Sequence, residues 1–110
     1  MSGYADVPAQ ETYDVDVIAA ATLACPAVAG LHAGGPLVVA TYLPGRRVDG
    51  VRVEDDRVLV SVVLLYGVPV RSLERQVRNA LAPHVDGRSV DVHVADVQPA
   101  RDMPSGETRG

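Results

Sequence analysis

The longest apolar run in the chain, VLVSVVLLY at Val58–Tyr66, contains a single polar residue, Ser61. Its valine content favours a β-strand over a helix, because β-branched side chains lose conformational freedom in helices. Apolar residues at both odd and even positions indicate a strand that is buried on much of both faces. A membrane-spanning helix needs roughly 20 apolar residues, so we predict the central strand of a sheet and no insertion into a membrane.

Shorter apolar segments predict the other strands of the N-terminal half. These strands are Val28–Ala33, Leu37–Leu43 and Val51–Val53. Pro44-Gly45 begins a turn that we expect to extend to Gly50. Asp55-Asp56-Arg57 is a polar connection of hairpin length, which predicts antiparallel pairing between Val51–Val53 and the central strand.

Two segments predict helices, and a last strand follows the second. Asp14–Ala24 is rich in alanine and begins with Asp14, a residue that can cap a helix. In the second segment, apolar residues recur at spacings of three and four, at Val70, Leu73, Val77 and Leu81. Pro83 and Gly87 predict its end. Valine then alternates with polar residues over Ser89–Val97, which predicts a strand with one wet face or edge.

Together these elements predict one domain at residues 13–97. The order helix, about four strands, helix, strand favours an α+β fold of two layers. We expect a mainly antiparallel sheet of about four or five strands, with both helices on one face. Residues 1–12 and 98–110 mix glycine, proline and charged residues without an apolar period, so we expect flexible tails there.

Composition narrows the range of functions. The 110 residues include ten arginines, no lysine and 14 acidic residues, which gives a net charge of -4. This balance disfavours binding to nucleic acid or directly to anionic lipid. The N-terminus carries acidic residues where an export signal would be basic and then apolar, so we expect a cytoplasmic protein. Phe and Trp are absent, which disfavours a deep ligand pocket and, with it, an enzyme.

Cys25 and the histidines are the residues that could support catalysis or bind a metal. The single cysteine cannot form an internal disulfide, and its apolar context indicates a buried, unreactive thiol. His32, His84 and His93 lie too far from one another and from Cys25 to provide the close ligand pairs that begin most zinc sites. We therefore predict no catalytic residue, no metal and no cofactor.

Three arginines are candidates for binding a partner. Arg46 and Arg47 lie in the predicted turn, and Arg52 lies in the strand that follows. Guanidinium groups bind carboxylates and phosphates with paired hydrogen bonds, so this cluster could bind an acidic partner or a phosphate. The alternative is that these arginines are only solvated.

A second candidate surface is one face of the central strand. Leu59, Val63 and Leu65 project to one side with Ser61, and the even-numbered residues from Val58 project to the other. Either face could carry the helices, because both are apolar. Two helices can cover only one of them, so we expect the other face to be buried by self-association or by a partner.

Several segments of the chain carry a resemblance to a known family. These segments are PAVAGLHAG, VATYLPGRRVDGVRV, YGVPV, LERQVRNALAP and VDVHVADV. Over roughly residues 14–97 the chain resembles the alkaline shock protein family of envelope stress response proteins, particularly its short members from high-GC Gram-positive bacteria. The resemblance implies a small, non-enzymatic cytoplasmic protein that associates with itself and with family paralogues. It also implies association with the cell envelope through a membrane-anchored partner.

The leading hypothesis from the sequence is therefore an envelope-associated interaction protein that acts as a self-associating scaffold or adaptor. The alternative is a small module that binds an anionic ligand or nucleic acid through Arg46 and Arg47. Salt-dependent retention on an anionic matrix would favour the alternative, whereas concentration-dependent self-association would favour the scaffold.

Overall fold

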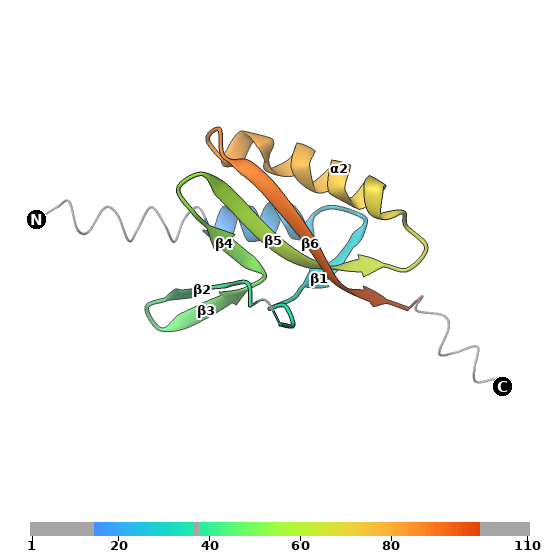
Figure 1. The fold of residues 1–110 in the computed structure, drawn as a ribbon, viewed down its shortest axis with the longest axis horizontal. Helices are drawn as coiled ribbons and strands as arrows, with labels where there is room; N and C mark the ends of the chain where they lie inside the picture. Colours follow the sequence, from blue (N-terminus) through green and yellow to red (C-terminus); the bar gives the residue numbers. More distant parts are fainter. Residues whose placement is uncertain (1–14, 37, 100–110) are drawn as a thin grey trace, which may run out of the picture.

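The computed structural model describes residues 15–36 and 38–99, and these residues form the predicted α+β fold (Figure 1). Residues 15–23 are helical and α2 spans Val70–Leu81, followed by the short 3-10 helix η1 at Ala82–His84. The strands are β1 Val28–Leu31, β2 Ala40–Leu43, β3 Arg46–Asp49, β4 Val51–Val53, β5 Arg57–Leu65 and β6 Ser89–Gln98. The predicted cap at Asp14, residues 1–12 and residues 100–110 lie outside the described part of the chain.

The central strand predicted from the apolar run is β5, which pairs on both of its edges. Along one edge it pairs with β6 over nine residue pairs, from Arg57–Ser89 to Leu65–Gln98. Along the other edge, β4 pairs with its first half and β1 with its second half, both antiparallel. The β5–β6 pairing is parallel because α2 carries the chain back to the starting end of the sheet, as a parallel crossover requires. The strands β2 and β3 form a separate two-stranded sheet.

Gly50 occupies the point where β1 and β4 meet beside β5. Its carbonyl accepts a hydrogen bond from the Ser61 N–H at 2.9 Å, and the Ser61 carbonyl accepts one from the His32 N–H at 2.9 Å. The φ angle of Gly50 is +86°, and a Cβ on this residue would lie 2.8 Å from the Ser61 carbonyl oxygen. Only glycine adopts this conformation and this approach without strain, so Gly50 allows two strands to share one edge.

Both helices cover the face of the sheet that carries the even-numbered residues of β5. Val58, Val60, Val62 and Leu64 belong to one buried cluster with Val15 and Ile18 of the first helix and with Leu73, Val77 and Leu81 of α2. Figure 1 shows the first helix behind β4 and β5, with α2 along the upper side of the sheet. Each of these buried side chains stabilises the fold by roughly 1.5–3 kcal/mol relative to exposure. The sequence left the choice of face open, and the structure assigns the helices to this one.

Four details of the sequence prediction are wrong. The turn at Pro44–Gly45 has two residues only, because Gly45 reverses the chain at a φ of +78° and lets β3 pair with β2. Val38 and Val39 lie outside any strand, and β2 begins at Ala40. Val70 is 44% exposed rather than part of the buried stripe, because it is the first residue of α2. Gln98 belongs to β6, not to the tail, since its carbonyl accepts a hydrogen bond from the Tyr66 N–H.

Candidate protein-interaction surface

The side of the four-stranded sheet opposite the helices, here called the outer face, carries the odd-numbered residues of β5. Leu59, Val63 and Leu65 are half-buried there, and Ser61 between them is fully buried. The register places charged or polar residues beside them: Arg52 and Asp91 flank Leu59, and His93 lies beside Ser61. The outer face is thus an apolar strip on the central strand with a polar border. The three apolar residues predicted for an uncovered face are brought together on it.

Ser61 is unusual within this strip. Its hydroxyl is buried and has no hydrogen-bond partner among the described residues. A buried hydroxyl without a partner costs about 1–3 kcal/mol of stability. The sequence shows Ser61 as the one polar residue of the run, but only the structure shows that it is fully buried.

The three candidate arginines do not converge on one site. Arg46 and Arg47 are consecutive residues of β3 and therefore point to opposite faces of the hairpin, and Arg52 belongs to β4. The Arg46 guanidinium donates two hydrogen bonds to the Asp16 carboxylate, at 2.8 and 3.1 Å, which joins the hairpin to the first helix.

Arg47 is paired within the hairpin itself. Its Nε lies 2.7 Å from Oδ1 of Asp49, and its guanidinium lies 5.8 Å from the centre of the Tyr42 ring. Tyr42 and, next, Asp49 raise the pKa of Arg47 above its ordinary value. The exposed Tyr42 was not singled out from the sequence, since an isolated tyrosine in a short strand gives no signal of a cation–π contact.

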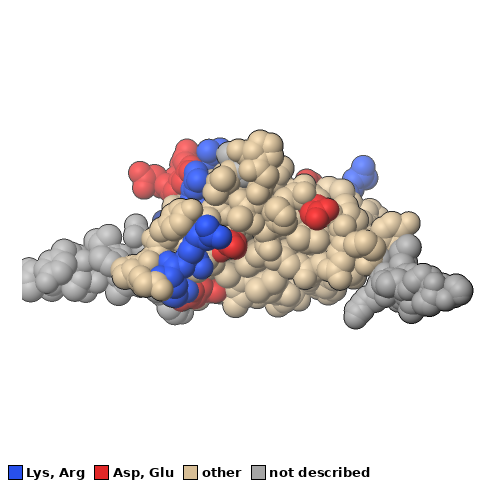
Figure 2. Space-filling view, turned by 90° about the horizontal axis from the view of Figure 1, so that it is seen from below, with Lys and Arg blue, Asp and Glu red and all other residues tan. Residues whose placement is uncertain are grey.

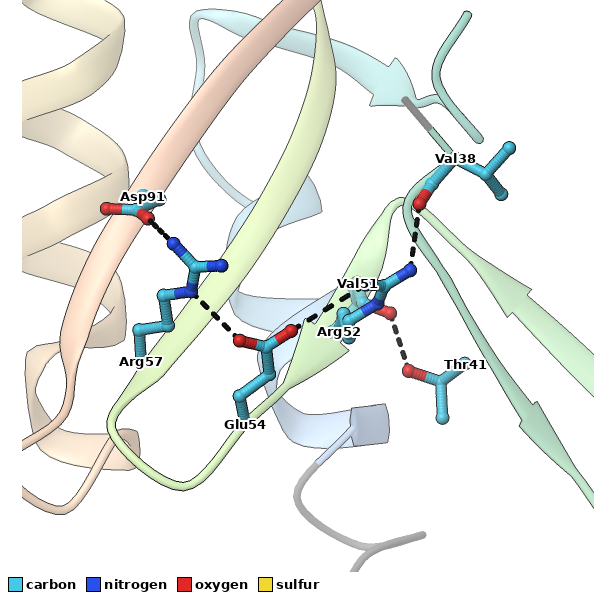
Figure 3. A network of polar contacts seen from close by, with 7 residues as sticks. All are labelled: Val38, Thr41, Val51, Arg52, Glu54, Arg57 and Asp91. Carbon is cyan, nitrogen blue, oxygen red and sulfur yellow. Dashed lines mark hydrogen bonds and ion pairs between the residues drawn. The ribbon is translucent and has the colours of Figure 1, made fainter. Parts of the chain in front are cut away.

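Arg52 belongs to a chain of ion pairs that crosses the sheet (Figure 3). It donates a hydrogen bond to the Val38 carbonyl at 2.9 Å and lies 3.6 Å from the Glu54 carboxylate. Glu54 accepts a hydrogen bond from Arg57 at 2.9 Å, and Arg57 lies 3.2 Å from Asp91 of β6. The hydrogen bond from Arg57 is the main cause that lowers the pKa of Glu54, and Glu54 in turn raises the pKa of Arg57. These contacts connect β4, β5 and β6, and the positive charge of Arg52 is paired with the Glu54 carboxylate.

A cleft of about 380 Å³ separates the hairpin from β4 and the turn that follows β4. Its lining residues are Val15, Ala40, Thr41, Tyr42, Leu43, Arg52, Val53, Glu54, Asp55 and Arg88. The Thr41 hydroxyl donates a hydrogen bond to the Val51 carbonyl at 2.6 Å, so this side chain is already engaged. Two arginines and two carboxylates line the cleft, which leaves no excess of positive charge for an anion.

The residues considered for catalysis or metal binding are dispersed. Cys25 is buried, and its thiol lies 3.6 Å from the Ala21 carbonyl oxygen. Burial raises the pKa of this thiol, which disfavours the reactive thiolate. Within residues 15–36 and 38–99, no three His, Cys, Asp or Glu side chains gather where they could hold a metal ion.

Charge is unevenly distributed over the surface. Figure 2 shows arginines and carboxylates gathered at one end of the molecule, beside a broad area that carries few charged groups. No helix of the described chain is both long and apolar enough to cross a membrane. A scan against protein-family models and searches of the curated proteins and of the solved structures found no match to the chain.

Proposed function

We propose that the protein is a non-enzymatic interaction protein, a self-associating scaffold or adaptor that binds proteins through its outer face. The observation that carries the proposal is the half-buried strip of Leu59, Val63 and Leu65 on the central strand, opposite the helix-covered face. Apolar residues grouped on a sheet face and bordered by polar residues are typical of a protein-binding surface.

The resemblance to the alkaline shock protein family supports a more specific setting. On this proposal the protein acts in the cytoplasm in the response to envelope stress, with family paralogues and a membrane-anchored protein as its partners. The segments that carry the resemblance include the strands β3, β4 and β6. The proposal needs no catalytic group, metal or cofactor.

The pairing of the arginines counts against the alternative, a module that binds an anionic ligand or nucleic acid. Arg46, Arg47 and Arg52 each have a carboxylate within 4 Å. An incoming phosphate would have to displace these carboxylates and would meet the negative net charge of the chain.

The proposal is tested by Val63→Glu, with Val62→Glu as its matched control. Val63 is half-buried on the outer face, whereas its neighbour Val62 is fully buried under the helices. We expect Val63→Glu to stay folded and to lose higher-order association and partner binding, because a carboxylate in the strip opposes an apolar interface. We expect Val62→Glu to unfold, since a buried unpaired charge costs several kcal/mol. Circular dichroism and light scattering measure the two effects.

A folded Val63→Glu variant that keeps the assembly mass and every partner of the parent protein would exclude the outer face as the binding surface. Proximity labelling in cells, with the parent and the variant compared, would show which neighbours depend on this face.

A further inference from the structure

The strand β6 forms one edge of the four-stranded sheet. Its pairing within the described chain is with β5, and none of its ten residues is buried. By contrast, β5 contains five buried residues. Natural sheets protect a long edge with charged side chains, lysine above all, with proline or with a bulge. The β6 sequence SVDVHVADVQ contains neither lysine nor proline, and the Asp91 carboxylate is already paired with Arg57. Asp96 and the irregularity at Ala95 come late in the strand.

The outward backbone groups of β6 can be assigned from its contacts with β5. The Ser89 N–H donates to the Asp56 carbonyl at 3.2 Å, so the backbone of Ser89 is directed toward β5. Backbone direction alternates along a strand, which directs Asp91 and His93 toward β5 as well. The N–H and C=O groups of Val90, Val92 and Val94 therefore point away from the sheet, over the straight part of the edge.

We propose that a second copy of the chain pairs with this edge, β6 against β6, antiparallel and centred on Val92. This inference rests on the self-association in the proposed function. It assigns the first step, the formation of a dimer, to the edge of β6. Pairing between identical strands about a twofold axis requires outward residues to meet outward residues. The axis at Val92 satisfies this, because Val92 then faces its own copy and Val90 faces the partner's Val94.

Charge selects this register over its neighbours. With the axis at Val92, Asp91 lies opposite the partner's His93, and the same contact occurs twice. Moving the axis to Asp91 would place two carboxylates opposite each other, which destabilises a strand pair. Moving it to His93 would place two histidines opposite each other and would bring Asp91 against the irregularity at Ala95.

The pairing also has a consequence for both faces of the sheet. Asp91 and His93 lie on the outer face, since they are opposite Leu59 and Ser61 of β5. Val90, Val92 and Val94 are partly buried against the core on the other face and would be covered by their copies. A dimer of this kind joins two outer faces into one surface that is twice as wide. Higher assemblies or partners then bind this wider surface.

The test is His93→Asp, which places two carboxylates opposite each other at both contacts. We expect the dissociation constant of the dimer to rise by about tenfold or more, with an unchanged circular dichroism spectrum. The exchanged variant Asp91→His with His93→Asp restores the pairs between the two copies. It also removes the exposed Arg57–Asp91 ion pair within each copy, which contributes little, so it should recover most of the parent affinity. His84→Asp, the same change at an exposed histidine away from the edge, is the matched control. Sedimentation velocity over a dilution series measures each constant.

Three results would overturn the proposal: a parent protein that is monomeric at every concentration, a His93→Asp variant with the parent affinity, or an exchanged variant that fails to recover. The roles of the β6 edge and of the outer face can be tested separately. Val63→Glu leaves β6 intact and should stop at a dimer, whereas Val63→Glu combined with His93→Asp should be monomeric. A monomeric parent that still binds partners through the outer face would reject the edge pairing and retain the proposed function.

Discussion

At the scale of single residues, the junction beside β5 depends on Gly50. The left-handed backbone and the close approach to Ser61 exclude a side chain at this position, and Leu31 Cβ and the His32 nitrogen are also within 3.0 Å of the Cβ position. A methyl group here would strain the backbone and separate β1 from β5. The sequence shows a glycine at the end of a turn, but not that three segments meet there.

We expect Gly50→Ala to destabilise the protein by about 2–5 kcal/mol, from backbone strain together with overpacking. Gly45→Ala is the matched control, because Gly45 also has a positive φ but has nothing within 4 Å of its Cβ position. That control should cost only the backbone part, about 1–2 kcal/mol. Urea unfolding of both variants measures the difference, and equal losses would show that the junction tolerates a side chain.

The ion pair of Glu54 predicts a dependence of stability on pH. Arg57 holds the pKa of Glu54 below its ordinary value. The ionised carboxylate therefore contributes stability above the ordinary carboxyl pKa, and this contribution is lost as the pH falls through the folded-state pKa.

We expect Glu54→Gln to lower the melting temperature slightly at neutral pH and not at all in acid below that folded-state pKa. The effect is small because both partners are partly exposed. Asp55→Asn removes the same charge from the next residue and serves as the control. A loss in the Glu54 variant that is the same at every pH would assign the effect to packing instead.

The partners of the candidate arginines could not be predicted from the sequence. Arg46 pairs with Asp16, which is 30 residues away. A pattern between neighbouring residues contains no information about so distant a pair. From the sequence alone, two adjacent arginines therefore suggest a cluster that binds a partner. Leu59, Val63 and Leu65 were predicted as one group because alternation along a strand is a local rule.

At the scale of elements, the prediction succeeded where one pattern covered a whole segment. The apolar spacing in α2, the alternation in β4 and β6 and the continuous apolar run of β5 gave boundaries close to those observed. It was wrong at Val38 and Val39, which lie outside any strand, and over Arg46–Asp49, where a strand takes the place of the predicted turn. Two glycines with positive φ, Gly45 and Gly50, lie on either side of that strand. The partner of β6 and its parallel direction also could not be predicted, since they depend on where α2 returns the chain.

The first two residues of the apolar stripe of α2 should differ in how much each contributes to stability. Leu73 is fully buried, whereas Val70 is 44% exposed. We expect Leu73→Ala to cost about 2–5 kcal/mol and Val70→Ala less than about 1 kcal/mol. Chemical denaturation distinguishes the two, and comparable losses would mean that Val70 packs against the core in solution.

At the scale of the whole molecule, charge is largely balanced within the fold. Six ion pairs connect arginines to carboxylates among the described residues. Association through the outer face should therefore depend more on apolar contact than on long-range attraction between charges. This separates the proposed interaction protein from a module that binds anions.

We expect the protein to pass through an anionic matrix at physiological salt without retention, because its net charge is -4 and its arginines are paired. Its self-association should persist at high salt, where charge-based contacts weaken. The variant Arg46→Ala with Arg47→Ala should behave like the parent in both measurements. Salt-sensitive retention of the parent, lost in this variant, would favour the anion-binding alternative.

The arrangement of strands around β5 also sets an order of events during synthesis. One edge of β5 is completed by β4 and β1, which precede it in the chain. The other edge is completed only by β6, which follows α2. A nascent chain that ends before Ser89 therefore exposes the whole length of its most apolar strand on one side. Such a chain is prone to pair with other chains, so a fragment that ends within α2 should aggregate more readily than the full-length protein.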